Sequence, residues 1–174
     1  MTQDHKAVPG VILVLGGARS GKSRFAEGLI TALPGPWTYI ATAQAWDDEM
    51  RDRIHQHRAQ RVPGWTTVEA PLDLAPALAA HGHGPVLVDC LTLWLTNVML
   101  AERAVEEAVA ALEDALAACA GPVVLVGNEV GMGIVPENAL ARRFRDHAGR
   151  MHQRLAAMAT QVFLTVAGLP LKVK

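Results

Sequence analysis

Residues 16–23 combine the side chains and the spacing needed to bind phosphate. The segment fits the pattern G-x-x-x-x-G-K-[ST] of a phosphate-binding loop. Glycines let the backbone turn tightly, so that consecutive N–H groups converge on phosphate oxygens at the start of the next helix. In this pattern the Lys22 ammonium reaches the β- and γ-phosphates and the Ser23 hydroxyl ligates Mg²⁺. We therefore expect a nucleoside triphosphate to bind the whole loop: Gly16, Gly17, Ala18, Arg19, Ser20, Gly21, Lys22 and Ser23.

The segments on either side of the loop fit the same motif. The apolar run 11–15 predicts a buried strand, and a helical pattern follows the loop at Phe25, Ala26, Leu29 and Ile30. The alternative is a glycine-rich turn that matches the pattern by chance, but the strand and the helix are the context that the motif requires. The motif predicts triphosphate binding without specifying the reaction.

The charged segment 47–61 is a second candidate for chemistry. Its pattern predicts a helix, one face of which collects Ile54, His57, Arg58 and Arg61. A histidine beside arginines faces anions, which suits nucleophilic attack on a phosphorus atom. His55 and His57 are two positions apart and do not share a helix face, so this pair is poorly spaced for a metal. A solvated, charged helix is the alternative interpretation.

Asp89 ends an apolar strand that we expect over residues 86–89. Proteins with a phosphate-binding loop of this kind place an acidic residue at such a position, in the Mg²⁺ shell. The alternative is that Asp89 is the N-cap of the helix expected to begin at Leu91. The position and the charge favour the metal role.

Segment 128–138 contains several glycines and Glu129, and it follows the apolar run 123–126. After a central strand of a parallel sheet, such a segment faces the ligand-binding edge. A purely structural loop is the alternative. The next helix carries a group of arginines that could receive phosphate or form a solvated face: Arg142, Arg143, Arg145, Arg150 and Arg154.

Strand and helix patterns alternate along the chain. We expect strands at 11–15, 37–41, 65–69, 86–89, 123–126, 162–166 and 171–173. Helices are expected after residue 23, from 47, and at 72–80, 91–100, 104–118 and 139–159. This alternation predicts an α/β fold with a mostly parallel central sheet and helices on both faces. Helix 91–100 is too apolar for a surface helix, so we expect it under other elements or at a subunit interface.

The composition limits the class of protein. A chain of 174 residues with 51% hydrophobic residues suits one α/β domain over residues 1–174. A net charge of -1 gives no electrostatic basis for binding nucleic acid. No apolar run is long enough for a membrane span, and the polar N-terminus does not resemble a signal peptide. We therefore expect a cytoplasmic protein whose two cysteines, Cys90 and Cys119, are reduced core residues.

On these motifs the chain resembles the bifunctional adenosylcobinamide kinase / adenosylcobinamide-phosphate guanylyltransferase family of cobalamin biosynthesis. The resemblance covers nearly the whole chain, and it combines the phosphate-binding loop with segments 39–43, 48–57, 65–69, 89–92, 128–136 and 145–149. It implies a RecA-like P-loop fold and a homotrimer. It also implies two reactions: ATP or GTP phosphorylates adenosylcobinamide, and GMP then passes from GTP to that phosphate. The products of the second reaction are adenosylcobinamide-GDP and pyrophosphate.

The resemblance also implies roles for single residues. GMP travels through a covalent phosphoramidate on His57, with His55 as the competing position, so His57 and Lys22 are the expected catalytic residues. Asp89 and Ser23 are expected at the Mg²⁺. The further contacts with the nucleotide or its metal are Ala41, Thr42, Ala43, Arg58, Ala59, Gln60, Arg61, Glu69 and Asp89.

His152 departs from the family, which usually has Asn at this position. If that Asn positions the corrinoid or a neighbouring subunit, His152 alters affinity; we do not expect it to be catalytic.

Two other functions use part of the same motifs. One is a RecA-like nucleotide-binding module that switches a partner protein, and the other is a simple small-molecule kinase. Neither needs a nucleophilic histidine, so His57 and its arginines discriminate between these functions and the two-step enzyme.

Overall fold

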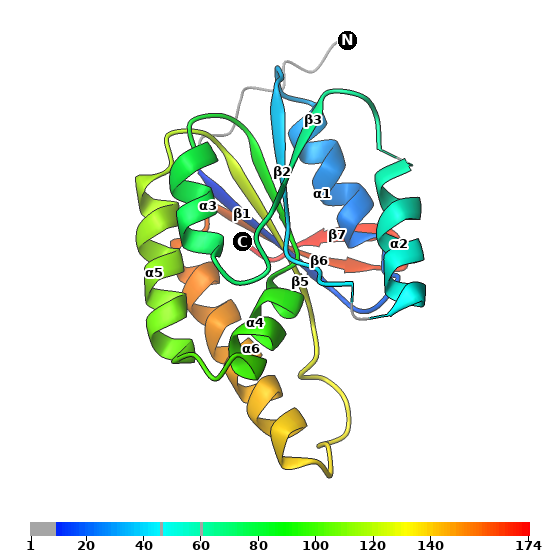
Figure 1. Cartoon of the computed structure of the whole chain (residues 1–174), viewed down its shortest axis with the longest axis vertical. Coiled ribbons are helices and arrows are strands. Elements are labelled where there is room, and N and C mark those ends of the chain that lie inside the picture. Colours follow the sequence, from blue (N-terminus) through cyan, green and yellow to red (C-terminus); the bar gives the residue numbers. More distant parts are fainter. Residues whose placement is uncertain (1–9, 46, 60) are drawn as a thin grey trace.

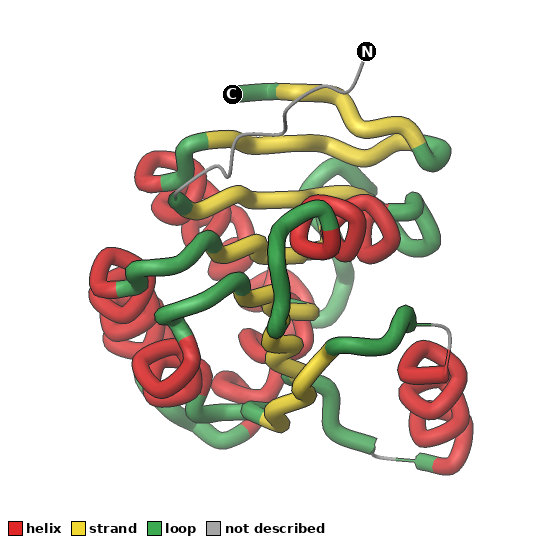
Figure 2. The backbone as a smooth tube through the Cα atoms, turned by 90° about the horizontal axis from the view of Figure 1, so that it is seen from above, coloured by secondary structure: helices red, strands yellow, loops and turns green. Residues whose placement is uncertain are grey.

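A seven-stranded sheet forms the centre of the protein in the computed structural model, with helices on both sides (Figures 1 and 2). The structure describes residues 10–45, 47–59 and 61–174, and only the backbone of Arg53 and His57. The strand order is β3-β2-β4-β5-β1-β6-β7. The strands are β1 (Val11–Gly16), β2 (Trp37–Ala41), β3 (Trp65–Glu69), β4 (Val86–Asp89), β5 (Val123–Asn128), β6 (Gln161–Val166) and β7 (Leu169–Lys172).

All neighbouring strands pair in parallel except β6 and β7, which are antiparallel. The predicted mostly parallel sheet is therefore confirmed. Two strands differ from their predicted bounds by two residues at one end: β7 begins at Leu169, and β5 continues to Asn128 because it pairs with β1 as far as Gly16. The carboxyl ends of β1, β2, β3, β4 and β5 lie at one edge of the sheet, where the loops with the candidate site residues begin.

Two apolar layers hold the helices on the sheet. The helices are α1 (Lys22–Thr31), α2 (Asp48–Ala59), α3 (Leu74–His81), α4 (Leu91–Leu100), α5 (Val105–Ala118) and α6 (Ala139–Met158). One core cluster joins α3, α4, α5 and α6 to the sheet, and a smaller cluster joins α1 to the other face. The polar helix α2 contributes to neither cluster and stands at the edge of the molecule (Figure 1).

Helix α4 is buried within its own chain. Leu91, Trp94, Leu95 and Val98 are each at most 2% exposed, and the Trp94 indole N–H donates to the carbonyl of Leu72. Of the two explanations predicted for this apolar helix, burial under other elements is the one that these residues show. Its last residue, Leu100, is 55% exposed.

Helix α2 is shorter than the charged segment suggested. It begins at Asp48 and ends at Ala59, and Asp47 accepts a hydrogen bond from the Met50 N–H at its start. Arg61 follows in a turn closed by its N–H and the carbonyl of Arg58. The prediction that Arg61 shares a helix face with Ile54 and Arg58 is therefore wrong, because the helix stops before it.

Helix α6 uses its polar residues mainly for internal structure. Arg154 forms ion pairs with Glu113 and Glu106 of α5, so it is not available for phosphate. His152 is 7% exposed and lies against Gly127 of β5, and burial lowers its pKa. This buried position does not favour direct contact of His152 with a corrinoid or a second subunit.

Both cysteines are free thiols, as expected, but only Cys90 is fully buried. Cys119, at the end of α5, is half-buried. Among the helices that the structure describes, none combines the length and the apolar character that crossing a bilayer requires.

Candidate active site

The phosphate-binding loop lies between β1 and α1, at the carboxyl edge of the sheet. Gly21 is the N-cap of α1 and has a φ of 89°, a region in which residues with a side chain are strained. A Cβ atom on Gly16 would lie 2.5 Å from Ser20 Oγ, so the loop can only fold back over this position if it is glycine. The backbone thus has the tight turn that brings N–H groups to the helix N-terminus.

Polar groups surround this loop. The Lys22 ammonium donates to the carbonyl of Gly17 at 2.9 Å and so spans the mouth of the loop. Ser20 Oγ is buried and has no hydrogen-bond partner among the described residues. The Gly168 N–H donates to the carbonyl of Ser20 at 2.8 Å, which ties the loop to the β6–β7 turn. The contact with Gly168 therefore stabilises the loop, and the Lys22 ammonium and the Ser20 hydroxyl are two of the polar side-chain groups within it.

A cavity of about 540 Å³ lies between α2 and the carboxyl ends of β2, β3 and β4. Helix α2 contributes Met50, Ile54, His55 and Arg58 to its wall. None of residues 16–23, all of which are described, lines it. The cavity is therefore a second compartment at the same edge of the sheet.

The two arginines of this cavity have different partners. Arg58 forms an ion pair with Glu69 at 2.8 Å, and both side chains are largely exposed, so the pair adds little stability. The Arg61 guanidinium lies 3.4 Å from the centroid of the Tyr39 ring and donates weakly to Thr67 Oγ1 at 3.3 Å. The cationic side chains of Arg58 and Arg61 and the anionic side chain of Glu69 therefore face the same cavity. Such a lining suits a nucleotide, whose phosphates are anionic and whose nucleobase carries hydrogen-bonding groups.

The residues at the end of β2 and just after it have two different roles: one holds the structure together and two line the cavity. Thr42 is fully buried, and its hydroxyl donates to the Cys90 carbonyl and accepts from the Cys90 N–H. Asn97 Nδ2 donates to the carbonyl of Thr42. The Thr42 side chain is thus part of the framework, whereas Ala41 and Ala43 line the cavity.

Asp89 lies at the boundary between the cavity and the phosphate-binding loop. Its Oδ2 accepts a hydrogen bond from the Tyr39 hydroxyl at 2.9 Å. The N-cap of α4 is Cys90, whose sulfur accepts from the Leu93 N–H, so Asp89 is not the helix cap. Burial and the Asp89 charge raise the pKa of the Cys90 thiol to about 11, although nearby Lys22 lowers it. β1 and β4 both pair with β5, so the loop after β1 and the end of β4 are separated by one strand at the same edge of the sheet.

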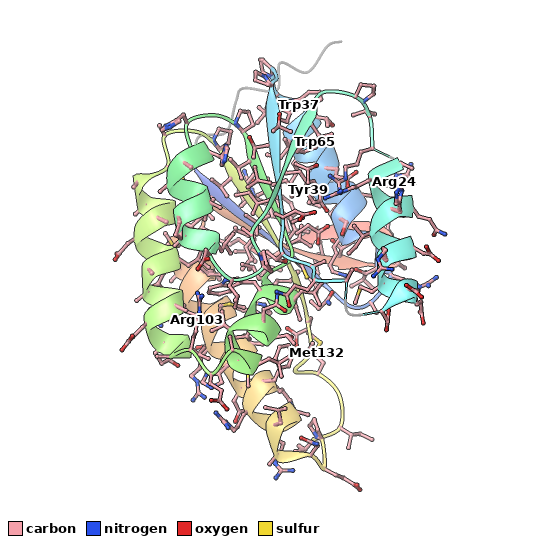
Figure 3. All side chains as sticks on the ribbon, viewed as in Figure 1. Arg24, Trp37, Tyr39, Trp65, Arg103 and Met132 are labelled. Carbon is pink, nitrogen blue, oxygen red and sulfur yellow. The ribbon has the colours of Figure 1, made fainter. Side chains whose placement is uncertain are left out.

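The segment between β5 and α6 extends away from the body of the molecule (Figure 1). The Asn128 N–H donates to Thr92 Oγ1 at 2.7 Å, and the Asn128 Oδ1 atom is buried without a partner among the described residues. Arg145 donates to the carbonyl of Gly131 and holds the loop. Met132 and Ile134 are 78% and 98% exposed, so the loop also presents apolar side chains to its surroundings (Figure 3).

The expected nucleotide and catalytic residues fall into two groups. The first group is the phosphate-binding loop. The second group lines the cavity and consists of Ala41, Ala43, His55, Arg58, Arg61, Glu69 and Asp89. Ala59 is the exposed last residue of α2. Gln60 lies outside the described residues, and His57 is described by its backbone alone, so the choice between His55 and His57 rests on experiment.

Tyr39 is the residue that sequence reasoning missed. The sequence places it in the strand expected at 37–41 and assigns it no role at the site. Its contacts with Asp89 and Arg61 depend on β2 lying between β3 and β4, and this strand order is not visible in local sequence.

The sheet, its ligand edge and the phosphate-binding loop define a RecA-like P-loop nucleotide-binding protein. Among solved structures, one ATPase domain has a TM-score of 0.50, at 9% identity, over 89% of this chain and 68% of that one. A prototypical ATPase from the type III secretion system of pathogenic bacteria has a TM-score of 0.57, also at 9% identity, over 94% of this chain and 56% of that one. These similarities concern the fold alone.

The family model for cobinamide kinase / cobinamide phosphate guanyltransferase matches residues 12–173, and the chain belongs to this family of enzymes. The bifunctional adenosylcobalamin biosynthesis protein CobP of Pseudomonas aeruginosa is 48% identical over 93% of this chain and 96% of its own length. The bifunctional adenosylcobalamin biosynthesis protein CobU of Salmonella typhimurium is 46% identical over 94% of this chain and 99% of its own length.

Proposed function

We propose that this enzyme phosphorylates adenosylcobinamide with ATP or GTP and then transfers GMP from GTP to adenosylcobinamide phosphate, in cobalamin nucleotide-loop assembly. The observation that carries the proposal is the pairing of a phosphate-binding loop with a cavity lined by histidine, arginine and acid at one sheet edge. The names of the relatives support the same pathway. A pure kinase or a nucleotide switch needs no histidine in this second compartment.

In the kinase step, the loop amides and Lys22 bind the β- and γ-phosphates and stabilise the charge that develops there. The hydroxyl of adenosylcobinamide attacks the γ-phosphorus, and ADP or GDP leaves. Arg58, Arg61 and Glu69 line the cavity into which the rest of the nucleotide extends. We expect the same phosphate-binding loop to bind the triphosphate in both reactions.

In the transfer step, the neutral imidazole of His57 attacks the α-phosphorus of GTP. A nitrogen–phosphorus bond forms, the bond to pyrophosphate breaks, and pyrophosphate leaves. A phosphate oxygen of adenosylcobinamide phosphate then attacks the same phosphorus and releases the imidazole. The imidazole is regenerated, and the product is adenosylcobinamide-GDP.

Ser23 and Asp89 would hold Mg²⁺. Both offer oxygen, the ligand atom that Mg²⁺ prefers, and within the described part of the chain no three His, Cys, Asp or Glu side chains form a metal cluster. This agrees with an ion that takes its remaining ligands from phosphate and water. When bound, Mg²⁺ neutralises phosphate charge.

The test of the function is product formation. Purified protein with adenosylcobinamide, GTP and Mg²⁺ is expected to yield first adenosylcobinamide phosphate and then adenosylcobinamide-GDP, separated by chromatography. Formation of the phosphate alone would support the simple kinase, and hydrolysis without either product would support the nucleotide switch.

We expect Asp89→Asn to raise the Mg²⁺ concentration for half-maximal activity by about tenfold or more, because a carboxylate near the metal loses its charge. Titration of Mg²⁺ at saturating GTP measures this effect. Asp114→Asn, on the exposed side of α5, is the matched control and should behave like the parent protein. An unchanged requirement in Asp89→Asn would remove Asp89 from the metal site.

We also propose a homotrimer, as the family resemblance implies. A groove of about 390 Å³ between the end of α4 and the start of α6, lined by Met99, Leu100, Leu140 and Phe144, supports a contact between copies. Light scattering is expected to give a mass three times that of one chain, and Leu140→Asp is expected to lower it. A parent protein with the mass of one chain at micromolar concentration contradicts the proposal.

A further inference from the structure

Tyr39 connects two groups of the candidate site that lie on different elements. Its ring is 2% exposed, and its hydroxyl donates to Asp89 Oδ2 at the end of β4. The Arg61 guanidinium, from the turn after α2, covers the face of the ring at 3.4 Å from its centroid. One side chain therefore contacts both the carboxylate proposed for the metal and a cation of the nucleotide cavity.

The sheet fixes the position of this ring. In β2, Tyr39 pairs with Thr67 of β3 and Leu87 of β4. Its ring packs on Trp65 in a T-shaped arrangement, with 5.7 Å between centroids, and Trp65 packs in turn on Trp37 at 5.6 Å (Figure 3). The aromatic cluster restricts the ring to one orientation, so the hydroxyl and the ring face are directed by the core rather than by solvent.

The hydroxyl donates directly to one oxygen of the carboxylate, Asp89 Oδ2, at 2.9 Å. The hydrogen bond occupies one carboxylate oxygen and sets the orientation of the group, as outer-shell partners do for metal ligands.

We propose that Tyr39 is a positioning residue for both reactions, which orients the Asp89 carboxylate through its hydroxyl and the Arg61 guanidinium through its ring face. The proposal rests on the proposed roles of Asp89 at Mg²⁺ and Arg61 at the nucleotide. It separates two effects of one residue: the hydroxyl controls the metal requirement, and the ring controls the affinity for the nucleotide.

Two substitutions separate these effects. Tyr39→Phe keeps the ring and removes the hydroxyl, so the Mg²⁺ half-saturation of GTP-analogue binding should rise about tenfold, while affinity in EDTA stays at the parent value. Tyr39→Leu also removes the cation–π contact, so affinity in EDTA should fall by about two- to fivefold. The measurement is the fluorescence of a methylanthraniloyl-labelled, non-hydrolysable GTP analogue at stepped Mg²⁺ concentrations.

Trp65→Phe is the matched control. It alters packing against the Tyr39 ring without removing the contacts of Tyr39 with Asp89 and Arg61. If Tyr39 only fills the core, Tyr39→Phe and Trp65→Phe should give the same Mg²⁺ half-saturation. That result overturns the proposal, whereas a rise in Tyr39→Phe alone supports it.

A second readout needs no substitution at Tyr39. The sequence contains a single tyrosine, so growth with 3-fluorotyrosine places one fluorine probe in the protein, at Tyr39. We expect its NMR signal to shift when Mg²⁺ is added to the protein with the GTP analogue, and the shift to disappear in Asp89→Asn. A signal that ignores Mg²⁺ in the parent protein contradicts the proposal.

The proposed function and this inference fail in different ways. If Asp89→Asn raises the Mg²⁺ requirement and Tyr39→Phe does not, Asp89 keeps its role and only the role of Tyr39 is wrong. If neither variant raises the requirement, the metal role of Asp89 is wrong, and the role of the Tyr39 hydroxyl is wrong with it.

Discussion

In the His57→Ala variant we expect guanylyl transfer to fall by more than about a thousand-fold, because a covalent route loses its nucleophile. Protein incubated with GTP labelled at the α-phosphorus should carry no label on a denaturing gel. Phosphorylation of adenosylcobinamide should remain measurable, since that step uses a hydroxyl nucleophile and the γ-phosphorus. The two activities are thus expected to separate at one residue.

The physical reason for a covalent route is charge. Direct transfer requires GTP and a phosphate ester, both anionic, to meet in one site. Attack by a neutral imidazole divides the reaction, so that pyrophosphate leaves before the acceptor phosphate reacts. In the cavity, Arg58 is paired with Glu69 and Arg61 is stacked on Tyr39, so both guanidinium groups are held where phosphate oxygens can displace or join their partners.

His55→Ala is the matched control, because His55 lies on the same helix as His57 and its own side chain lines the cavity. It should still be labelled by GTP. The adduct on the parent protein should be lost in acid and survive base, as a nitrogen–phosphorus bond does. If His57→Ala takes up label and His55→Ala does not, the nucleophile is His55. Normal labelling of both variants contradicts the covalent mechanism at this helix.

The elements of the fold were predictable because their signals are local. The residues that form β1, β2, β3 and β4 and the helix pattern of α6 are each contiguous in sequence, and the observed bounds follow the predicted ones closely. The phosphate-binding loop was equally accessible, because its glycines and its lysine belong to one contiguous motif. The burial of α4 also followed from its composition.

The cavity was only partly predictable, because it is assembled from distant segments. Helical periodicity suggested that Arg61 follows Arg58 on one face, but the helix ends at Ala59, and Arg61 packs on Tyr39 of β2 instead. The side chain of Thr42 is buried and does not line the cavity, because its hydroxyl bonds to Cys90, which follows the neighbouring strand β4. Such contacts depend on strand order, which a local pattern does not contain.

In the Lys22→Ala variant we expect both activities to fall by about a hundred-fold or more, because one cradle serves both triphosphates. The lysine supplies a fixed charge where negative charge develops in the transition state, and removal of such a preorganised donor typically costs this much. The variant should fold normally, since the ammonium lies at the surface and donates to the Gly17 carbonyl of its own loop. Binding of the labelled GTP analogue and both product assays measure the effect.

Arg24→Ala is the matched control for Lys22→Ala. It removes one positive charge from the same first turns of α1, at an exposed position, and leaves the loop unchanged. If general electrostatic attraction of GTP were the cause, both variants would lose similar activity and higher salt would remove the difference from the parent protein. A loss confined to Lys22→Ala and maintained in salt assigns the effect to the position of its ammonium. Near-normal turnover of both reactions in Lys22→Ala would remove the phosphate-binding loop from the mechanism.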